Sequence, residues 1–330
     1  MTISVVLASY NGAEYIREQL DSLLAQTLQP DEIIVSDDGS TDATWDIVMG
    51  YKSRFPILFH VYRNETRLGP HANFKHAFHY AHGDLIAPCD QDDIWLPEKL
   101  EKSVNALGEG YSFVFCQEVI QYERIGRHEA FRKMPLLKDC VLSNSISGHL
   151  IVFRRELLKV FDIAPEITFD WGLTLMAVVL GTGTKTDYVG CIWRRHRGVV
   201  TLEYSDGYKK EKRQKSKWSK YFCAVRLLLR GRRSEVIARR MHSVADIIDQ
   251  TPMVSFEEDS KIRRLAFKVA ESMSEQRVAS LFRASFAYML LSGYEDNTHR
   301  YSVREKIGAA MYAFCYPAVW WYDYHNHKAL

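Results

Sequence analysis

Several common sequence patterns are missing from this chain of 330 residues. Its six cysteines are scattered and form no Cys-x-x-Cys pair, which argues against a zinc ribbon and favours reduced thiols in a cytosolic protein. A basic leader with an apolar core is also missing, because Met1 leads directly into the strand-like run 3–8. We therefore expect a protein without a signal peptide or a zinc site.

Two nucleotide-binding signatures are absent as well. No Gly-x-Gly-x-x-Gly turn follows the first apolar run, and no Gly-Lys-Ser or Gly-Lys-Thr sequence occurs. These absences argue against dinucleotide binding and against P-loop NTPase chemistry. Internal repeats and low-complexity linkers are lacking too, while the 47% hydrophobic and 25% charged shares suit a soluble protein with a large core.

Charge of one sign does not dominate the whole chain, whose net charge is +2, but it is unevenly spread. Residues 209–240 contain thirteen Lys or Arg and two Glu, so this window carries +11 and the remainder −9. The asymmetry predicts an anionic partner. Interleaved aromatic and leucine residues favour docking on anionic lipid or on a lipid-linked diphosphate. A solvated helical face or a subunit contact is the alternative, and no motif supports nucleic acid.

A hydrophobic run long enough to span a bilayer comfortably is also missing. The longest uncharged stretch, residues 307–322, has sixteen residues and a proline inside it. Its tyrosine and tryptophan content suits a membrane interface. A buried aromatic helix or a dimer contact explains the same composition, so membrane association and a homo-oligomer both remain open.

The first half of the chain alternates apolar strand-like runs with helical patterns. The predicted strands are 3–8, 32–36, 57–62, 85–87 and 111–120, and the predicted helices are 14–26, 43–51, 71–81 and 97–107. This order predicts a parallel α/β sheet with right-handed crossovers. From residue 144 the pattern predicts strands at 148–153 and 186–194, helices at 155–161 and 171–180, and then only helices at 209–240, 261–292 and 303–322.

Three of the predicted strands end in polar clusters. These are Ser9-Tyr10-Asn11, Asp37-Asp38-Gly39-Ser40 and Asp90-Gln91-Asp92-Asp93. Ligands of open α/β sheets bind at the carboxyl edge of the strands, so the three clusters are expected to converge on one cleft. Each cluster alone is weak support, because Asp-Gly-Ser is also an ordinary turn.

The acidic cluster after the fourth strand is the most informative segment of the chain. Asp90, Asp92 and Asp93 stand within four residues and repel one another unless a cation neutralises them or water surrounds them. An Asp-x-Asp pair at a strand end suits a hard cation that also binds phosphate oxygens. A solvated acidic loop before the helix near Pro97 is the alternative.

With these motifs in place, residues 2–200 resemble a family 2 nucleotide-sugar glycosyltransferase of the GT-A fold. The resemblance is carried by 5–12, 34–42, Arg67-Leu-Gly69 with Asn73, and Asp90-Gln-Asp-Asp-Ile-Trp95. The last motif resembles the rhamnosyltransferase branch of surface polysaccharide assembly. The resemblance implies a GT-A domain at 1–200, with a mostly parallel sheet flanked by helices. A basic, mainly helical region at 201–330 would contact the acceptor, the membrane or another subunit.

The resemblance also implies roles for individual residues. Asp90 and Asp92 match the Asp-x-Asp motif that binds Mg²⁺ or Mn²⁺ on the donor diphosphate, with Asp93 behind them or against the donor sugar. Tyr10 and Asp37 match positions that hold the base and the ribose. The full set of implied nucleotide-binding residues is Ser9, Tyr10, Asn11, Asp37, Asp38, Arg67 and Asn73.

Two later segments complete the implied site. Asp170 matches the position of the catalytic base, although relatives carry His-Asp where this chain has Phe169. Asp170 is also a good helix N-cap before an apolar run. Arg194 and His196 match a closing segment that supports the diphosphate, with His196 also a metal ligand or, alternatively, part of a surface basic patch. His149 lies near the implied acceptor region and receives no role.

Together these points predict an inverting, divalent-metal-dependent glycosyltransferase. It would move a sugar from a nucleoside diphosphate, dTDP-rhamnose or a UDP-sugar, to a hydroxyl of a lipid-linked or growing cell-surface glycan. We expect it on the cytoplasmic face of the membrane as a peripheral protein. The alternative is an inactive relative that binds nucleotide sugar or assembles with partners at the membrane surface.

Overall fold

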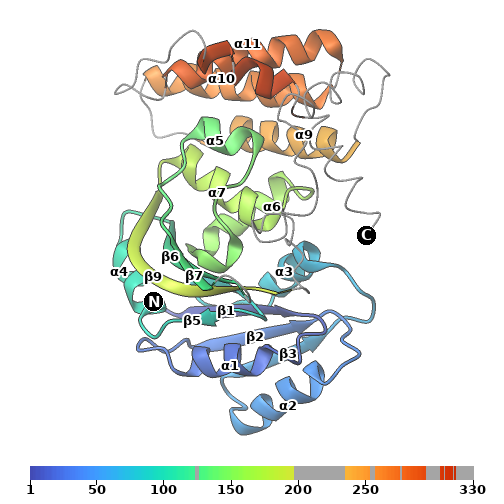
Figure 1. Ribbon diagram of the computed structural model, residues 1–330, viewed down its shortest axis with the longest axis vertical. Coiled ribbons are helices and arrows are strands. Elements are labelled where there is room, and N and C mark those ends of the chain that lie inside the picture. Colours follow the sequence, from blue (N-terminus) through green and yellow to red (C-terminus); the bar gives the residue numbers. More distant parts are fainter. Residues whose placement is uncertain are drawn as a thin grey trace.

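A computed structural model describes residues 1–122, 126–196, 235–252, 257–275, 277–294, 305–307, 309–314 and 316. Its centre is a mixed sheet with the strand order β3-β2-β1-β4-β8-β6-β9-β5, and β7 pairs with β6 at the side. Figure 1 shows α1 and α2 on one side of β1–β3, α6 and α7 on the other, and α9, α10 and α11 stacked beyond them.

The first half follows the alternation predicted from the sequence. Its strands are apolar runs buried on both faces, which is typical of parallel strands covered by helices. The elements are β1 (Ile3–Ser9), α1 (Ile16–Leu24), β2 (Glu32–Asp37), α2 (Thr44–Arg54), β3 (Phe59–Arg63), α3 (Pro70–Phe78), β4 (Leu85–Asp90) and α4 (Lys99–Leu107). Strands β1, β2, β3 and β4 all run parallel.

The second half adds antiparallel pairs to this parallel core. Strand β8 (Ile151–Arg154) runs against both β4 and β6 (Phe113–Tyr122), while β9 (Gly183–Arg195) runs parallel to β6. The short strands β5 (Ile94–Trp95) and β7 (Gly126–Ala130) pair with β9 and β6. The remaining elements are α5 (Leu137–Leu142), η1 (Gly148–Leu150), η2 (Arg155–Lys159), α6 (Val160–Ile163) and α7 (Phe169–Leu180).

Beyond the sheet the described chain is helical, as predicted. Helix α9 (Glu235–Gln250) packs against α7, and α10 (Glu257–Ser274) contacts α5 and α9. The predicted helix at 261–292 is divided between α10 and α11 (Val278–Tyr294). Most of the basic window 209–240 and part of 307–322 lie outside the described residues. Within the described part, no helix combines the length and apolar character needed to cross a membrane.

The register of the central strands determines where the polar clusters lie. Ser9 at the end of β1 pairs with Asp37 at the end of β2, and Ala8 pairs with Asp90 at the end of β4. The three strand ends are therefore aligned side by side at one edge of the sheet. This confirms the convergence of the clusters, because the carboxyl ends of adjacent parallel strands share an edge.

Candidate active site

The turn after β2 uses its two carboxylates to hold itself together. Asp37 is fully buried, and its oxygens accept hydrogen bonds from Ser9 Oγ at 3.1 Å and from Ser40 N and Oγ at 2.9 and 2.5 Å. Arg63 Nε lies 3.5 Å from Asp37 Oδ2. The carboxylate that was expected to face a base thus bonds to protein groups, and its nucleotide-binding role stays a prediction.

Asp38 is also closed to solvent, with 2% exposure. Its oxygens accept hydrogen bonds from Asn64 Nδ2 at 2.9 Å, Leu68 N at 2.7 Å and Gly69 N at 2.8 Å. Asn73 is buried beside it and is bonded through its amide to Ser36. These contacts fix the loop that carries Arg67. Asp38 and Asn73 therefore stabilise the backbone of the predicted nucleotide site, and their own role in binding the nucleotide stays a prediction.

The turn after β1 presents an aromatic surface. The Arg67 guanidinium lies 3.9 Å from the centre of the Tyr10 ring, an arrangement typical of cation–π stacking. Asn11 adopts a left-handed backbone conformation with φ of 47°, and its side chain accepts a hydrogen bond from Thr41 N at 2.8 Å. This combination of an exposed guanidinium and a partly exposed ring suits a planar base.

Gln91, which the sequence analysis left without a role, joins this turn to the acidic motif. Its Oε1 accepts a hydrogen bond from Tyr10 N at 2.9 Å, and its Nε2 donates one to Tyr10 O at 3.0 Å. A Cβ at Gly12 would come within 2.1 Å of Gln91 Oε1, so only glycine leaves room for this pair of bonds. The sequence feature that could have indicated this role is the amide side chain between aspartates in Asp-Gln-Asp-Asp.

The three aspartates of the acidic motif have different surroundings. The Asp90 side chain is 42% exposed and that of Asp92 is 19% exposed, whereas Asp93 is fully buried. Asp90 and Asp92 thus keep carboxylate oxygens open at the sheet edge, while Asp93 lies behind them. Accessible carboxylate oxygens next to an imidazole are a donor set that suits Mg²⁺ or Mn²⁺, so these residues fit the implied cation.

The end of β9 reaches the same place. His196 Nε2 lies 3.1 Å from Asp92 Oδ2, and the His196 ring stacks on Tyr15 with 4.1 Å between centroids. Arg194 donates hydrogen bonds to Asp92 O at 2.6 Å and to Tyr15 O at 3.2 Å, and it also pairs with Glu18. His196 therefore lies beside Asp92, and its role at the metal or the diphosphate stays a prediction, whereas Arg194 holds the backbone of the acidic turn.

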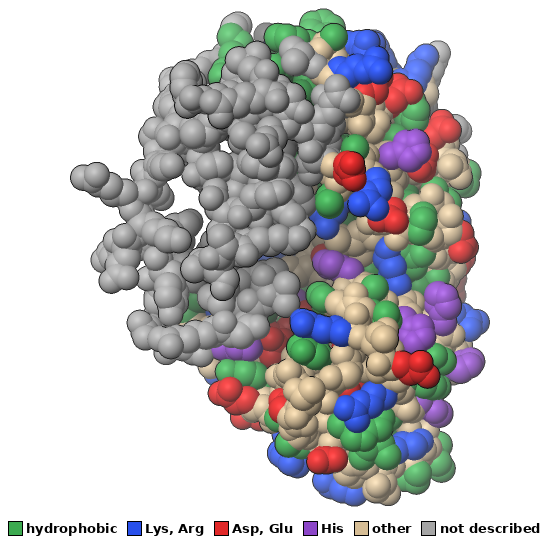
Figure 2. Space-filling view, turned by 90° about the vertical axis from the view of Figure 1, so that its right-hand side faces the viewer, with side chains coloured by type: hydrophobic (Ala, Val, Ile, Leu, Met, Phe, Trp, Pro, Cys, Tyr) green, Lys and Arg blue, Asp and Glu red, His purple; other side chains and the backbone are tan. Residues whose placement is uncertain are grey.

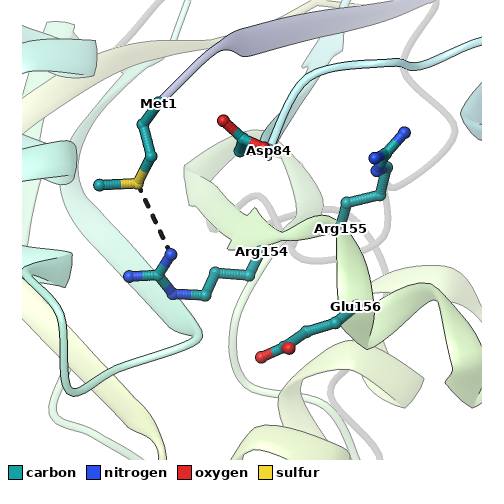
Figure 3. Close-up of a pocket in the computed structure, with 5 residues that line it drawn as sticks. All are labelled: Met1, Asp84, Arg154, Arg155 and Glu156. Atoms are coloured by element: carbon teal, nitrogen blue, oxygen red, sulfur yellow. Dashed lines mark hydrogen bonds between the residues drawn. The ribbon is translucent and has the colours of Figure 1, made fainter.

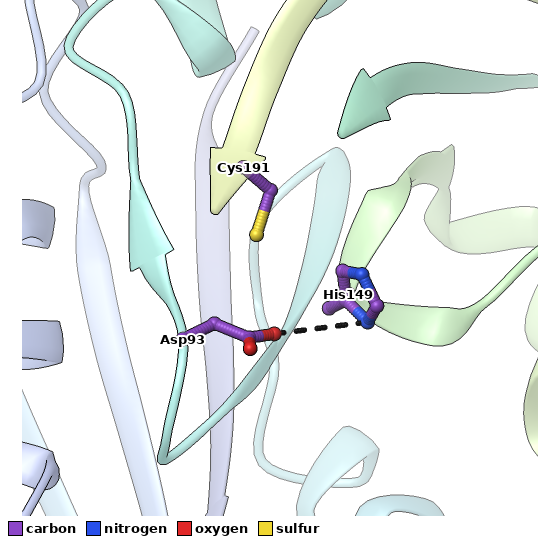
Figure 4. Close-up of side chains that lie close together, drawn as sticks. All are labelled: Asp93, His149 and Cys191. Carbon is purple, nitrogen blue, oxygen red and sulfur yellow. Dashed lines mark ion pairs between the residues drawn. The ribbon is translucent and has the colours of Figure 1, made fainter. Parts of the chain in front are cut away.

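Burial changes the acidity of Asp93. Desolvation raises its pKa to about 8, the neighbouring carboxylates of Asp90 and Asp92 act in the same direction, and His149 opposes them. Asp93 Oδ1 accepts a hydrogen bond from Arg194 N at 3.2 Å, but among the described residues Oδ2 has no hydrogen-bond partner. That oxygen points toward His149 at 3.7 Å (Figure 4).

His149 is the second residue to which the sequence analysis gave no role. Its ring is buried between Asp93 and the fully buried Glu118, whose Oε2 lies 2.8 Å from His149 Nε2. Cys191 Sγ completes a trio with Asp93 and His149 (Figure 4). The available signal was Gln117-Glu118, two polar residues inside an otherwise apolar strand pattern.

Asp170 lies in the first turn of α7 and is partly buried. Its Oδ1 accepts a hydrogen bond from Trp171 N at 2.9 Å, a contact that leaves Oδ2 for other groups. Desolvation of the His71 ring lowers its pKa, while the carboxylates of Asp170 and Asp90 act in the opposite direction. Both carboxylates therefore act on the charge of the same ring, and the role of Asp170 as the base stays a prediction.

Phe169 replaces the histidine expected before Asp170 and packs inward. Its ring lies 4.5 Å from that of Phe74, and a Cβ at Gly148 would come within 2.3 Å of it. Phenylalanine at this position thus packs an apolar ring against Phe74 and Gly148, next to Asp170 in the sequence. Phe169 is 4% exposed, so its contribution is to packing at the start of α7.

A separate cavity of about 650 Å³ lies at the opposite edge of the sheet. It is lined by Met1, Asp84, Arg154, Arg155 and Glu156, of which Arg154 reaches toward the Met1 sulfur (Figure 3). Met1 precedes β1 and Asp84 precedes β4. The cavity is therefore remote from the carboxyl edge where the predicted site residues gather.

Comparison with known proteins follows the same division of the chain. Residues 4–162 match the family Glycosyl transferase family 2. The Escherichia coli UDP-Glc:alpha-D-GlcNAc-diphosphoundecaprenol beta-1,3-glucosyltransferase is 31% identical over 219 residues, which are 64% of this chain and 83% of that protein. An uncharacterised Mycobacterium tuberculosis protein is 34% identical over 216 residues. That match covers 62% of this chain and 62% of the M. tuberculosis protein.

The fold is also found in a solved structure. The crystal structure of Staphylococcus aureus TarS 1–349 in complex with UDP has a TM-score of 0.59 at 18% identity, covering 96% of this chain and 89% of that one. The likeness extends past the sheet into the helical region, and it establishes a GT-A-like α/β fold followed by helices. With the family match and the similarity to the E. coli enzyme, this chain belongs to glycosyl transferase family 2.

Proposed function

We propose that this protein is an inverting, metal-dependent glycosyltransferase that uses a nucleoside diphosphate sugar. One observation carries the proposal: Asp90 and Asp92 keep open carboxylates at the sheet edge that also presents Tyr10 and Arg67, and His196 lies beside Asp92. A base-stacking surface and a cation-binding surface thus stand on adjacent strand ends. Membership of the family supports sugar transfer as the reaction class.

Each end of the donor has residues suited to it. Tyr10 and Arg67, which stack on each other, would form one surface against which the base lies. Asp90, Asp92 and His196 would hold Mg²⁺ or Mn²⁺ against the diphosphate. When bound, the cation would neutralise the charge that develops on the departing nucleoside diphosphate. Arg194 would keep the acidic turn in place through its bonds to Asp92 O and Tyr15 O.

Asp170 is the proposed base. As the acceptor oxygen forms its bond to the anomeric carbon, the bond between that carbon and the diphosphate oxygen breaks, and the diphosphate keeps the electron pair. The acceptor proton passes to an Asp170 carboxylate oxygen. Attack from the face opposite the leaving group inverts the anomeric configuration. Trp171 N, which donates to Asp170 Oδ1, orients the carboxylate.

The substrates are proposed at the level of their chemistry. The printed activity of the E. coli relative uses UDP-glucose and an acceptor on a diphosphoundecaprenol carrier, which supports a UDP-sugar and a lipid-linked glycan acceptor. The acidic motif continues to favour dTDP-rhamnose as the second donor to test. Donor binding would rest on residues 1–200, and acceptor or membrane contacts on 201–330.

A melting-temperature panel with matched transfer assays tests the proposal. UDP or dTDP with Mn²⁺ should raise the melting temperature of the wild-type protein. Asp170→Asn should keep this shift while lowering kcat about 10²- to 10⁴-fold. The exposed variant Asp162→Asn is the control and should transfer at the wild-type rate. A protein that binds no pyrimidine nucleotide would overturn the proposal.

The alternative, an inactive nucleotide-sugar-binding partner, makes a different prediction in the same experiment. It predicts the melting-temperature shift without transfer in the wild type, and no difference between wild type and Asp170→Asn. The open carboxylates of Asp90 and Asp92 favour catalysis, because a non-catalytic protein has no need to keep two carboxylates available beside an imidazole.

We also propose that the helical region docks on an anionic membrane as a peripheral protein. The described residues contribute an apolar face on α11, where Phe282 is 62% exposed, Phe286 61% and Leu290 37%. Ile307, Met311 and Tyr312 are also exposed, whereas Ala313 is buried. On the face shown in Figure 2, charges of both signs are interspersed over the described surface.

Vesicle flotation tests the docking proposal. The double variant Phe282→Ser/Phe286→Ser should float less than wild type with phosphatidylglycerol vesicles, because it removes two exposed aromatic rings from the contact. Phe131→Ser, which changes a 61% exposed ring beside the sheet, is the matched control and should float as wild type does. Equal flotation of all three proteins would contradict docking through α11.

A further inference from the structure

His149 connects the acidic motif to a buried charge network on the neighbouring strands. Its Nε2 lies 2.8 Å from Glu118 Oε2, and its Nδ1 lies 3.5 Å from Asp90 Oδ2 and 3.7 Å from Asp93 Oδ2. One ring thus faces a carboxylate of β6 on one side and two carboxylates of the acidic motif on the other. Figure 4 shows the ring aimed at Asp93 across the gap between their elements.

Glu118, on the side of His149 opposite the acidic motif, is held firmly in place. Glu118 is fully buried, and Arg132 binds its Oε1 through Nε at 3.2 Å and Nη2 at 2.5 Å. Arg132 also donates to Ser145 O at 2.7 Å, which ties the same network to the segment before η1. A carboxylate bound by two nitrogens of one guanidinium has a fixed orientation. Glu118 can therefore set the plane of the His149 ring.

The backbone of His149 is held as firmly as its side chain. Lys99 is completely buried and donates from Nζ to His149 O at 2.6 Å. The same ammonium lies 3.2 Å from the centre of the Trp95 ring, just beyond the acidic motif. Both the main chain and the ring of His149 are consequently fixed relative to the strand ends that carry the aspartates.

The trio of Asp93, His149 and Cys191 also has the composition of a metal centre, but two of its polar atoms already have protein partners. His149 Nε2 is paired with Glu118, and Asp93 Oδ1 accepts a hydrogen bond from Arg194 N. Burial raises the pKa of the Cys191 thiol well above its usual value, and the Asp93 carboxylate acts in the same direction. A neutral thiol beside an imidazole–carboxylate contact favours a hydrogen-bonded network over a soft-metal site.

We propose that His149 is a positioning residue for the cation site: its ring joins the Asp90 and Asp93 carboxylates to Glu118 and thereby fixes the donor oxygens of the acidic motif. The inference rests on the proposed function, since it assumes that Asp90 takes part in binding the donor's cation. It adds to that function a residue from η1, in a segment remote in sequence from the acidic motif. Partners that orient ligand carboxylates and imidazoles typically affect metal affinity about 10- to 100-fold.

Manganese binding, measured by electron paramagnetic resonance with and without UDP, tests this role. His149→Phe should bind Mn²⁺ about 10- to 100-fold more weakly than wild type, because the ring stays but both nitrogens are lost. His128→Phe changes an exposed histidine on β7 and is the matched control. It should bind Mn²⁺ with wild-type affinity.

Two further variants separate positioning from packing. The amide of His149→Asn lies about where Nδ1 was, and the amide of His149→Gln about where Nε2 was. Asn should therefore retain more of the Mn²⁺ affinity, and Gln should retain more of the melting temperature through its contact with Glu118. Glu118→Gln should weaken Mn²⁺ binding in the wild-type background but add nothing to His149→Phe, because the two residues act in one chain.

The outcomes distinguish the inference from the function on which it rests. If the wild type binds no Mn²⁺ with UDP, the metal-dependent function fails and the inference fails with it. If the wild type binds Mn²⁺ and folded His149→Phe or His149→Gln binds it equally well, only the inference is overturned. One equivalent of zinc in the purified wild type that is lost in Cys191→Ser would also overturn it, by showing a metal centre at the trio.

Discussion

Two acidic turns stand at the same edge of the sheet and have opposite surroundings. After β2, Asp37 and Asp38 are closed and bonded to hydroxyl, amide and backbone N–H groups of their own turn, of β1 and of the segment after β3. After β4, Asp90 and Asp92 keep open oxygens and lie near histidines. The same residue type therefore stabilises a loop in one turn and keeps oxygens accessible in the other. What differs is the number of N–H and O–H donors that the surrounding segments direct at each carboxylate.

The largest effect is expected when the open turn loses a charge. Asp92→Asn should lower the transfer rate about 10³-fold, because it removes one anionic ligand from a site that stabilises several kcal/mol of transition-state charge. The melting temperature should change little, since Asp92 takes no part in the core. A steady-state assay with matched calorimetry checks both statements. Turnover at the wild-type rate would remove the distinction between the two turns.

The closed turn should respond in stability. Asp38→Asn keeps the shape but loses the charge that accepts hydrogen bonds from Leu68 N and Gly69 N. We expect unfolding in urea to become easier by about 1–3 kcal/mol, the usual cost of leaving buried polar groups poorly paired. Transfer by the molecules that remain folded should fall much less than in Asp92→Asn. An unchanged urea midpoint would show that Asp38 does not hold the loop.

A smaller effect is expected from the Ser40 hydroxyl, which links the closed turn to the turn after β1. Ser40 Oγ donates to Asp37 Oδ1 and accepts a hydrogen bond from Asn11 N at 2.9 Å. Ser40→Ala should lower the free energy of unfolding by about 0.5–1.5 kcal/mol. Thr41→Ala, next to it but exposed, serves as the comparison and should cost less. Urea denaturation of both variants decides the matter.

The smallest effect is expected at the stacked pair. Arg67→Ala removes the guanidinium from the proposed base-stacking surface. A contact between this cation and the base of about 0.5–1 kcal/mol at an exposed site corresponds to a 2- to 5-fold weakening of nucleotide binding. Calorimetric titration with UDP measures it. Stability should not change, because Arg67 is exposed. If Asp38→Asn weakens UDP binding more than Arg67→Ala does, the closed turn contributes more to nucleotide affinity than the exposed cation does.

The central strands and their order along the chain were predictable from the sequence, because β1, β2 and β4 are continuous apolar runs. Strand β7 was not, since Gly-Arg-His-Glu-Ala has no alternation of apolar and polar residues, and β5 has only two residues. The convergence of the polar clusters also followed from the pattern. The burial of Asp37 did not, because it depends on Ser9 and Ser40 being turned inward.

Contacts between distant segments mark the limit of the sequence analysis at the site. His149 meets Glu118 only because β8 and β6 are neighbours in the sheet, an arrangement that no local periodicity reports. His196 lies beside Asp92 in the structure, and its role as a metal ligand, which the resemblance implies, stays a prediction. Arg194 was expected at the diphosphate, yet its guanidinium is occupied by Asp92 O, Tyr15 O and Glu18.

The paired hydrogen bonds between Gln91 and the main chain of Tyr10 have a further consequence. They make the turn proposed to face the base and the turn proposed to face the phosphates one unit, whose two halves cannot separate without breaking both bonds. In the proposed function, this unit would fix the distance between the base site and the diphosphate site. A nucleotide that is one phosphate too short or too long would then reach one of these sites and miss the other.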